Sequence, residues 1–336
     1  MFKKLLLPLV LILAAPNSIL NSDIEEKLQQ IDSEFSGNLG VYIKYLGDES
    51  TINYNTERNW YLASTIKIPL GIAILQKVEE GELSLDDKIM LEEYHLVDGS
   101  GDLLWHEPGT SFTIRELLER MIKDSDSTAT DMLIALLGED EFNEQIRNSI
   151  VSEGFEPFTT ILQVRYDAYG ELHENAANLT NMDIIKLKGV TPMSNRLEAL
   201  LQVIAVDKND IKIKTIPDAF EEYYKSNLNS GRLQTMGLVL EQFAEGEYLN
   251  EEHTKILLDI MKSVTTGDNR IKAGFPGDTE FAHKTGTQIG RACNVGIVYP
   301  EQEDPLIVAA CAEKYQSLKE AESAFEKIGR MLAESW

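Results

Sequence analysis

A serine and a lysine three positions apart, Ser64 and Lys67, form the pair in this sequence best suited to covalent chemistry. A serine hydroxyl is a weak nucleophile at neutral pH and needs a neighbouring base to take its proton. A lysine amine can be that base when burial and nearby cations lower its pKa. Because side chains three apart project from one face of a helical turn, Ser64 is predicted to attack while Lys67 accepts its proton.

A helix must hold this pair in place. Residues 65–81 are dense in apolar side chains and predict a buried helix with Ser64 at its N-terminus. The free backbone N–H groups of such an end can hold the negative charge that develops on an acyl oxygen. The alternative interpretation of the pair is a polar helix cap followed by a surface lysine.

Two more short motifs follow along the chain. Ser125-Asp126-Ser127 lies between two helical stretches, at 114–121 and 129–137. Lys284-Thr285-Gly286 lies in a short segment flanked by apolar, strand-like sequence. An exposed strand edge at that motif would be able to pair with an extended substrate backbone.

The three motifs, in this order, resemble those of the serine β-lactamase and penicillin-binding protein superfamily. Residues 99–101, 107–110 and 265–274 also resemble class A β-lactamases. The resemblance implies a fold of the α/β (α+β) class, in which an antiparallel sheet built from both termini and flanked by helices adjoins an all-helical domain. The alternating apolar residues near both ends of the chain agree with strands at those places.

The resemblance also implies roles for the residues of the second and third motifs. Ser125 would relay a proton to the leaving nitrogen, and Thr287 would supply a second N–H group for the oxyanion. Substrate would be bound by Ser127 and by the third motif, which comprises Lys284, Thr285 and Gly286. Arg270 would reach a substrate carboxylate, for which a guanidinium is well suited; the alternative is a surface arginine on a turn.

Two residues depart from the family pattern. Ser127 and Asp131 stand where asparagine is usual in the family. The asparagine amide at the first position grips the acyl-amide carbonyl of the substrate. A shorter hydroxyl cannot make the same contact, so the pocket is expected to differ from that of other members.

The carboxylate that activates water for deacylation can be aligned in three ways. One alignment offers Asp167, and a second offers Glu171 with Asn175 four residues on, as in the family's Ω-loop. A third leaves Tyr169 in that place. The alternative is that these acids are solvated loop charges.

The stretch between the second and third motifs exceeds the family's usual length by about 55 residues, which predicts an inserted segment within roughly 165–232. The predicted sheet domain comprises 22–64 and 265–336, and the predicted helical domain is 65–264 with that insertion. The motifs would then meet at the cleft between the domains.

The N-terminus predicts export. Two lysines precede an apolar run at 5–15 that is too short to span a bilayer, so residues 1–21 are predicted to be a signal peptide. A periplasmic or secreted protein, with no membrane association after cleavage, is expected. The net charge of −25 disfavours nucleic acid as a partner. The expected partner is a small-molecule substrate, and the expected state is a monomer.

The two cysteines and five histidines do not indicate a metal. No histidine shows the spacing of metal ligands, so neither a metal nor another cofactor is predicted. Cys293 and Cys311 lie on the two arms of a predicted hairpin. Two buried free thiols are the favoured prediction, because a register error of one residue would put the side chains on opposite faces. A disulfide, which export permits, is the alternative.

Together these features predict an exported serine hydrolase of the class A β-lactamase type that acts on β-lactam amides through an acyl-serine intermediate. A penicillin-binding-like D,D-peptidase or an esterase with the same nucleophile is one alternative. A weakly catalytic protein that binds β-lactams or wall peptides is the other.

Overall fold

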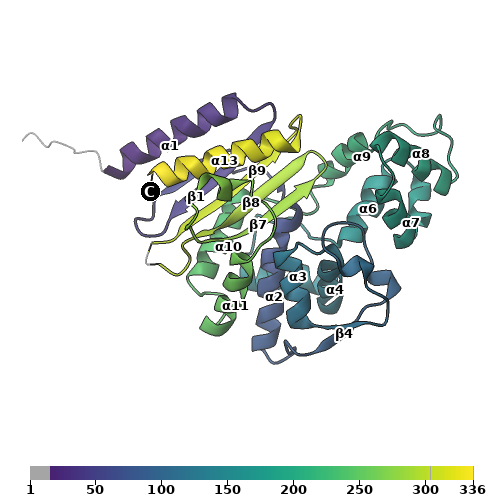
Figure 1. The fold of residues 1–336 in the computed structure, drawn as a ribbon, viewed down its shortest axis with the longest axis horizontal. Helices are drawn as coiled ribbons and strands as arrows, with labels where there is room; N and C mark the ends of the chain where they lie inside the picture. Colours follow the sequence, from purple (N-terminus) through teal and green to yellow (C-terminus); the bar gives the residue numbers. More distant parts are fainter. Residues whose placement is uncertain (1–15, 303, 336) are drawn as a thin grey trace, which may run out of the picture.

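A computed structural model describes residues 16–302 and 304–335 (Figure 1). The apolar run of the predicted signal peptide lies outside these residues. The described part of the chain contains no helix long and apolar enough to cross a membrane.

A five-stranded antiparallel sheet forms the centre of the fold, with strand order β2-β1-β9-β8-β7. The strands are β1 (Asn38–Tyr45), β2 (Thr51–Tyr54), β7 (Phe281–Gln288), β8 (Arg291–Val298) and β9 (Leu306–Glu313). Two strands come from the N-terminal part and three from the C-terminal part, which confirms the predicted sheet. The third motif lies on β7, an edge strand.

Helices cover both faces of this sheet (Figure 1). Side chains of β9 alternate between two apolar cores, with Ile307 and Ala309 on one side and Val308 and Ala310 on the other. This alternation follows from the two-residue period of a strand. One face packs against α1 (Pro16–Ser33) and α13 (Leu318–Ser335), and the other against α10 (Leu233–Ala244) and α11 (Glu251–Lys262).

The first two motifs lie where helices begin. The short helix η1 (Ala63–Ile66) carries Ser64 and leads into α2 (Lys67–Glu79), which is buried as predicted. The second motif connects α3 (Ile114–Lys123) to α4 (Ser127–Leu137). Two further α-helices are α5 (Glu139–Gln145) and the short α12 (Ile271–Gly274). Two small strand pairs lie outside the main sheet: β3 (Trp60–Tyr61) pairs with β6 (Ser230–Gly231), and β4 (Lys88–Met90) pairs with β5 (Ser111–Thr113).

Residues 161–226 form a helical lobe that extends away from the sheet (Figure 1). Its helices are α6 (Ile161–Gly170), α7 (Asn181–Lys188), α8 (Met193–Val203) and α9 (Ile216–Tyr223). The lobe encloses an apolar core of its own, to which Tyr61 is the main contribution from outside. The lobe coincides with most of the predicted insertion; the division of the whole chain into two domains stays a prediction.

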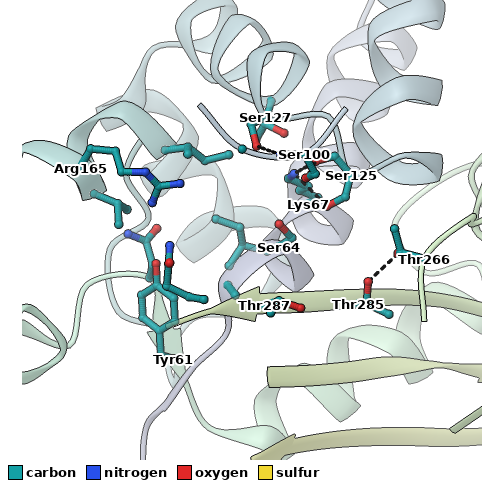
Figure 2. A pocket seen from close by; sticks show the side chains of 18 of the residues that line it. Tyr61, Ser64, Lys67, Ser100, Ser125, Ser127, Arg165, Thr266, Thr285 and Thr287 are labelled. Carbon is teal, nitrogen blue, oxygen red and sulfur yellow. Dashed lines mark hydrogen bonds between the residues drawn. The ribbon is translucent and has the colours of Figure 1, made fainter. Parts of the chain in front are cut away.

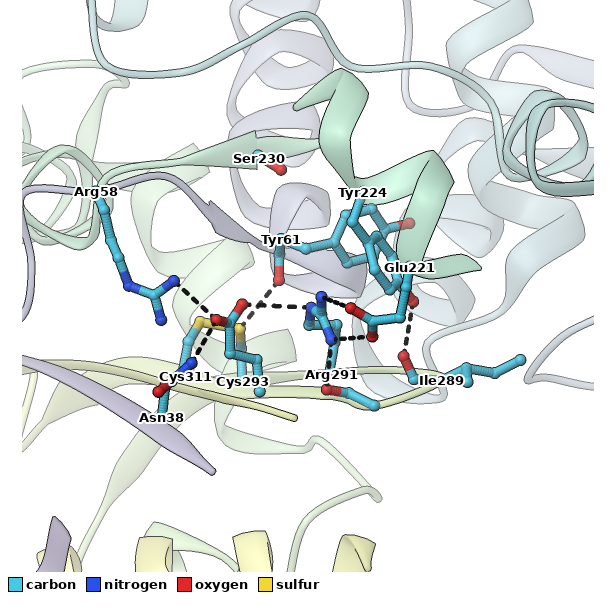
Figure 3. Close-up of polar contacts among 12 residues, drawn as sticks. Asn38, Arg58, Tyr61, Glu221, Tyr224, Ser230, Ile289, Arg291, Cys293 and Cys311 are labelled. Carbon is cyan, nitrogen blue, oxygen red and sulfur yellow. Dashed lines mark hydrogen bonds and ion pairs between the residues drawn. A yellow bond between two sulfur atoms is a disulfide. The ribbon is translucent and has the colours of Figure 1, made fainter. Parts of the chain in front are cut away.

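Polar contacts join the lobe to the sheet (Figure 3). The Arg291 guanidinium on β8 forms two ion-pair contacts with the Glu221 carboxylate on α9, of 2.7 and 3.0 Å. The Tyr224 hydroxyl donates a hydrogen bond of 2.8 Å to the Ile289 carbonyl oxygen, in the turn between β7 and β8. The α9 end of the lobe is thereby held against the edge of the sheet (Figure 1).

Cys293 and Cys311 form a disulfide, so the favoured prediction of two free thiols is wrong (Figure 3). The two residues are directly opposite each other on β8 and β9, with their Cα atoms 4.1 Å apart. Directly opposed residues of neighbouring strands share a face of the sheet, and this register could not be assigned from the sequence.

Replacing both cysteines with alanine is expected to lower the free energy of unfolding by about 2–4 kcal/mol, because a cross-link restricts the unfolded chain. Urea unfolding of the double variant and of the parent measures this change. Since neither cysteine lines the cavity described below, acylation of the folded variant serves as a control for native structure. Equal stabilities would contradict a cross-link in the folded protein.

Candidate active site

The three motifs meet at a cavity of about 360 Å³ (Figure 2). The residues of predicted function that line it are Ser64, Lys67, Ser125, Ser127, Thr285, Thr287 and Arg270. Gly286 and Lys284 lie on β7, next in sequence to the lining residues Thr285 and Thr287. The structure thus brings together residues that are more than 200 positions apart in the chain.

The turn that carries Ser64 packs tightly against strand β7. A Cβ atom at Gly286 would lie 2.6 Å from the Leu62 carbonyl oxygen and 3.1 Å from the Ser64 backbone nitrogen. Only glycine therefore allows the strand to approach the turn of Ser64 this closely. This contact explains why the third motif ends in glycine, and it brings Thr287 of β7 to the same cavity as Ser64.

Lys67 is the first residue of α2, and its side chain is buried. Its Nζ donates to the Ser125 carbonyl oxygen at 2.6 Å and lies 3.1 Å from Ser125 Oγ. Burial lowers the pKa of Lys67 to about 7, although the negative charges of Asp126 and Asp131 oppose this shift. The amine is thus prepared to accept a proton near neutral pH.

The rate of acylation is expected to rise with pH and to level off above about 7, the pKa of Lys67. The rate should fall at low pH because only the neutral amine of Lys67 can accept the Ser64 proton. As the pH falls below the pKa, Lys67 becomes protonated and can no longer act as the base. The pH dependence is measured as the rate of labelling by a fluorescent penicillin, at points about one pH unit apart between roughly pH 5 and pH 9. A rate that does not change over this range would contradict general-base catalysis by Lys67.

The second motif is held by a network around Ser100. The Ser127 N–H donates to the Ser100 carbonyl oxygen, and Ser127 Oγ accepts from the Ser100 N–H at 3.2 Å. The Ser100 hydroxyl donates to the Ser125 carbonyl oxygen at 2.6 Å. Asp126 caps α4 by accepting from the Ala129 N–H. The loop at 99–101 therefore fixes both serines of this motif.

The third motif is fixed by buried contacts. Lys284 is fully buried, and burial and the charge of Lys67 hold its pKa well below the usual range. The hydroxyls of Thr285 and Thr266 are hydrogen-bonded at 2.6 Å. Arg270 is buried rather than on a surface turn, and it donates to Thr287 Oγ1 at 2.6 Å.

Asp167 and Glu171 do not line the cavity. The Ω-loop suggested by the resemblance is replaced here by helix α6, which Thr160 caps by accepting from the Gln163 N–H. Asp167 faces another part of the surface and accepts from the Gln163 side chain, and Glu171 is exposed just after the helix. Within residues 16–302 and 304–335, no aspartate or glutamate lines this cavity.

Asp131 explains where helix α6 begins. Its two carboxylate oxygens accept from the Ile161 and Leu162 N–H groups at 2.7 and 2.9 Å. Burial raises the pKa of Asp131 to about 7, against the opposing effect of these two hydrogen bonds. As a result α6 contributes two apolar residues, Ile161 and Val164, to the cavity wall, together with Arg165.

Sequence reasoning missed several polar residues of the cavity wall, among them Tyr61, Arg165, Lys188 and Asn229. Asn229 is buried and hydrogen-bonded to Thr159 and Tyr223. These residues carry no local motif, and their contacts span long distances in the chain.

A sequence model of the β-lactamase enzyme family matches residues 23–336, almost the whole chain. The chain belongs to this family. The match confirms the predicted class A β-lactamase-like serine hydrolase and, at the level of the family, the predicted enzyme. A β-lactamase of Mycobacterium tuberculosis is 25% identical to this chain over 294 residues, which cover 87% of this chain and 78% of the relative.

Solved structures of β-lactamase-like proteins share the fold. An ancestral class A β-lactamase (GNCA) matches with a TM-score of 0.69 and 22% identity, over 93% of this chain and 100% of the other. A mutant of PBP-A, solved as an acyl-enzyme complex with penicillin G, matches with a TM-score of 0.68 and 21% identity, over 93% and 96%. The predicted fold class is thereby confirmed.

Proposed function

We propose that this member of the β-lactamase enzyme family opens β-lactam amides by forming an acyl-enzyme on Ser64. The observation that supports this most directly is that Ser64, Lys67 and Ser125 line one cavity, with Lys67 Nζ 3.1 Å from Ser125 Oγ. A buried amine with its pKa lowered to about 7 beside a serine is the arrangement that activates a hydroxyl nucleophile.

The proposed reaction begins when Ser64 Oγ attacks the lactam carbonyl carbon and its proton passes to Lys67 Nζ. The negative charge on the carbonyl oxygen is held by the N–H groups of Ser64 and Thr287. As the carbon–nitrogen bond breaks, Ser125 passes the proton from Lys67 to the leaving nitrogen. Water then cleaves the ester to complete the hydrolysis.

The substrate would be held by the polar groups around this centre. Ser127 and the third motif would contact its polar groups, and Arg270 would act on its carboxylate through Thr287, to which it donates. The protein is further proposed to be an exported monomer that acts in the periplasm or the medium without metal or cofactor. A gel-filtration profile and detection of the processed N-terminus by mass spectrometry would test these points.

Among the residues that the structure describes, no carboxylate lines the cavity, and this favours a second candidate, a penicillin-binding-like D,D-peptidase or an esterase. Without a carboxylate beside the ester, water is activated poorly and the acyl group stays on Ser64 longer. Such an enzyme would pass its acyl group to a better acceptor than water, or release it slowly. A protein that only binds β-lactams or wall peptides is the limiting case.

Intact-protein mass spectrometry after mixing with penicillin G separates these functions. Acylation by penicillin adds its whole mass to the protein, because the leaving nitrogen remains attached through the opened ring. An adduct that disappears within seconds to minutes indicates hydrolysis, and one that persists for hours indicates the peptidase or binding function. The absence of any adduct on Ser64, at any time, would contradict the proposed acyl-enzyme.

A further inference from the structure

The wall of the cavity formed by the helical lobe is positively charged. Arg165 on α6 and Lys188 at the end of α7 both line the cavity. In the described part of the chain no aspartate or glutamate lines the cavity, and one carboxylate behind the wall, that of Asp98, faces both cations. The charge is local, since the whole chain carries a net charge of −25.

Arg165 has unused capacity to bind. Its side chain is 8% exposed, and its Nε forms an ion pair of 2.6 Å with Asp98 Oδ1. Its Nη1 is buried and has no hydrogen-bond partner among the described residues. Figure 2 shows the guanidinium on the side of the cavity opposite Thr285, with Ser64 between them. A guanidinium that is only 8% exposed has lost most of its hydration, and its Nη1 gains no hydrogen bond in return, so an anion in the cavity beside it is favoured.

Lys188 adds a second positive charge beside the same carboxylate. Its Nζ lies 4.0 Å from Asp98 Oδ2, and its side chain is about half exposed, at 52%. Burial and the positive charge of Arg165 lower the pKa of Lys188, although the carboxylate of Asp98 opposes this shift. One carboxylate, Asp98, cannot neutralise two cations, and a further anion between them would relieve the repulsion.

We propose that Arg165 and Lys188 form a subsite for a carboxylate on the acyl side chain of the substrate. This inference rests on the proposed acylation of Ser64. The acyl side is assigned because Thr285 and Arg270 lie on the β7 side of Ser64, where the carboxylate of the leaving part would bind, whereas Arg165 lies across from them. The preferred substrate class is thus an amide whose acyl group carries its own carboxylate.

Matched pairs of penicillins test this preference. Each pair consists of a 6-acylaminopenicillanic acid with a glutaryl or adipoyl side chain and the methyl ester of that side-chain carboxyl group. The two members have nearly equal length, and both keep the ring carboxylate. We expect acylation of Ser64 to be faster for the acid than for the ester by at least about tenfold, the lower range for a hydrogen bond to a charged group.

Substitutions of Arg165 and Lys188 test whether these residues cause the preference for the acid over the ester. Lys188→Gln is expected to lower the acid-to-ester ratio by about threefold or more, and Arg165→Gln is expected to bring it close to one. Lys186→Gln is the matched control, because this exposed lysine lies on the same helix and does not line the cavity. The ratio should remain that of the parent in this control. A general loss of structure would slow both members of a pair and leave their ratio unchanged.

Binding of the acid and the ester to the Ser64→Ala variant tests the subsite independently of the proposed acylation. If no penicillin acylates the parent, the acyl-enzyme proposal fails. The subsite is then judged by titration calorimetry of the same acid and ester on Ser64→Ala. Tighter binding of the acid, lost in the Ser64→Ala/Lys188→Gln double variant, supports the subsite. Equal affinity or equal acylation rates for acid and ester in the parent overturn it.

Discussion

Ser64→Ala is expected to form no covalent adduct with penicillin G or with a fluorophosphonate probe. The variant removes the only atom proposed to attack, and no other residue of the cavity can take its place on the same turn. Lys67→Ala should acylate at least about 100-fold more slowly than the parent, the lower range for loss of a general base. Stopped-flow labelling and intact-protein mass spectrometry measure both effects.

A lysine elsewhere on the same helix provides the control for Lys67→Ala. Lys77 lies near the C-terminal end of α2, is paired with Glu80 and Glu82, and does not line the cavity. Lys77→Ala should acylate at the rate of the parent. Labelling that survives in Ser64→Ala, or equal rates for Lys67→Ala and Lys77→Ala, would rule out the proposed mechanism.

Ile161→Glu is expected to shorten the lifetime of the acyl-enzyme by about 100-fold or more, the usual gain from general-base catalysis. Ile161 lines the cavity from the first turn of α6, and that turn is fixed by hydrogen bonds from its N–H groups to Asp131. The isoleucine is only partly buried, so a glutamate there would stay hydrated. Its carboxylate would accept a proton from the water that attacks the ester.

The neutral variant Ile161→Gln separates this effect from a change of shape. It should release the acyl group at about the rate of the parent, because an amide cannot accept the proton. Deacylation is followed by the loss of adduct mass after excess penicillin is removed. A parent that already deacylates within seconds, with Asp167→Asn or Glu171→Gln slowing it, would mean that a sequence-predicted carboxylate reaches Ser64 after all.

Local sequence was sufficient to predict much of the fold. Strand β1 has alternating apolar residues, β8 and β9 are rich in apolar residues, and α2 and α13 have dense or periodic apolar residues. Each of these patterns depends on neighbours along the chain and can be recognised without tertiary contacts. The three motifs were recognised for the same reason.

Features that depend on distant residues could not be predicted in this way. The disulfide depends on the register of β8 and β9, which a shift of one residue would change. The replacement of a loop by α6 depends on Asp131. Its carboxylate accepts a hydrogen bond from the Ile161 N–H group, 30 residues later in the chain. The position of Arg165 depends on Asp98, 67 residues earlier in the chain.

The separate apolar core of the helical lobe has a consequence for how this enzyme can diverge. Residues 161–226 pack mainly on themselves, and they meet the sheet at contacts such as the one between Arg291 and Glu221. Insertions and exchanges within the lobe can therefore remodel one wall of the cavity while the turn that carries Ser64 keeps its geometry. A chimaera that receives this lobe from a relative, with Tyr61 and Glu221 retained, should inherit the donor's substrate preference and keep its own nucleophile.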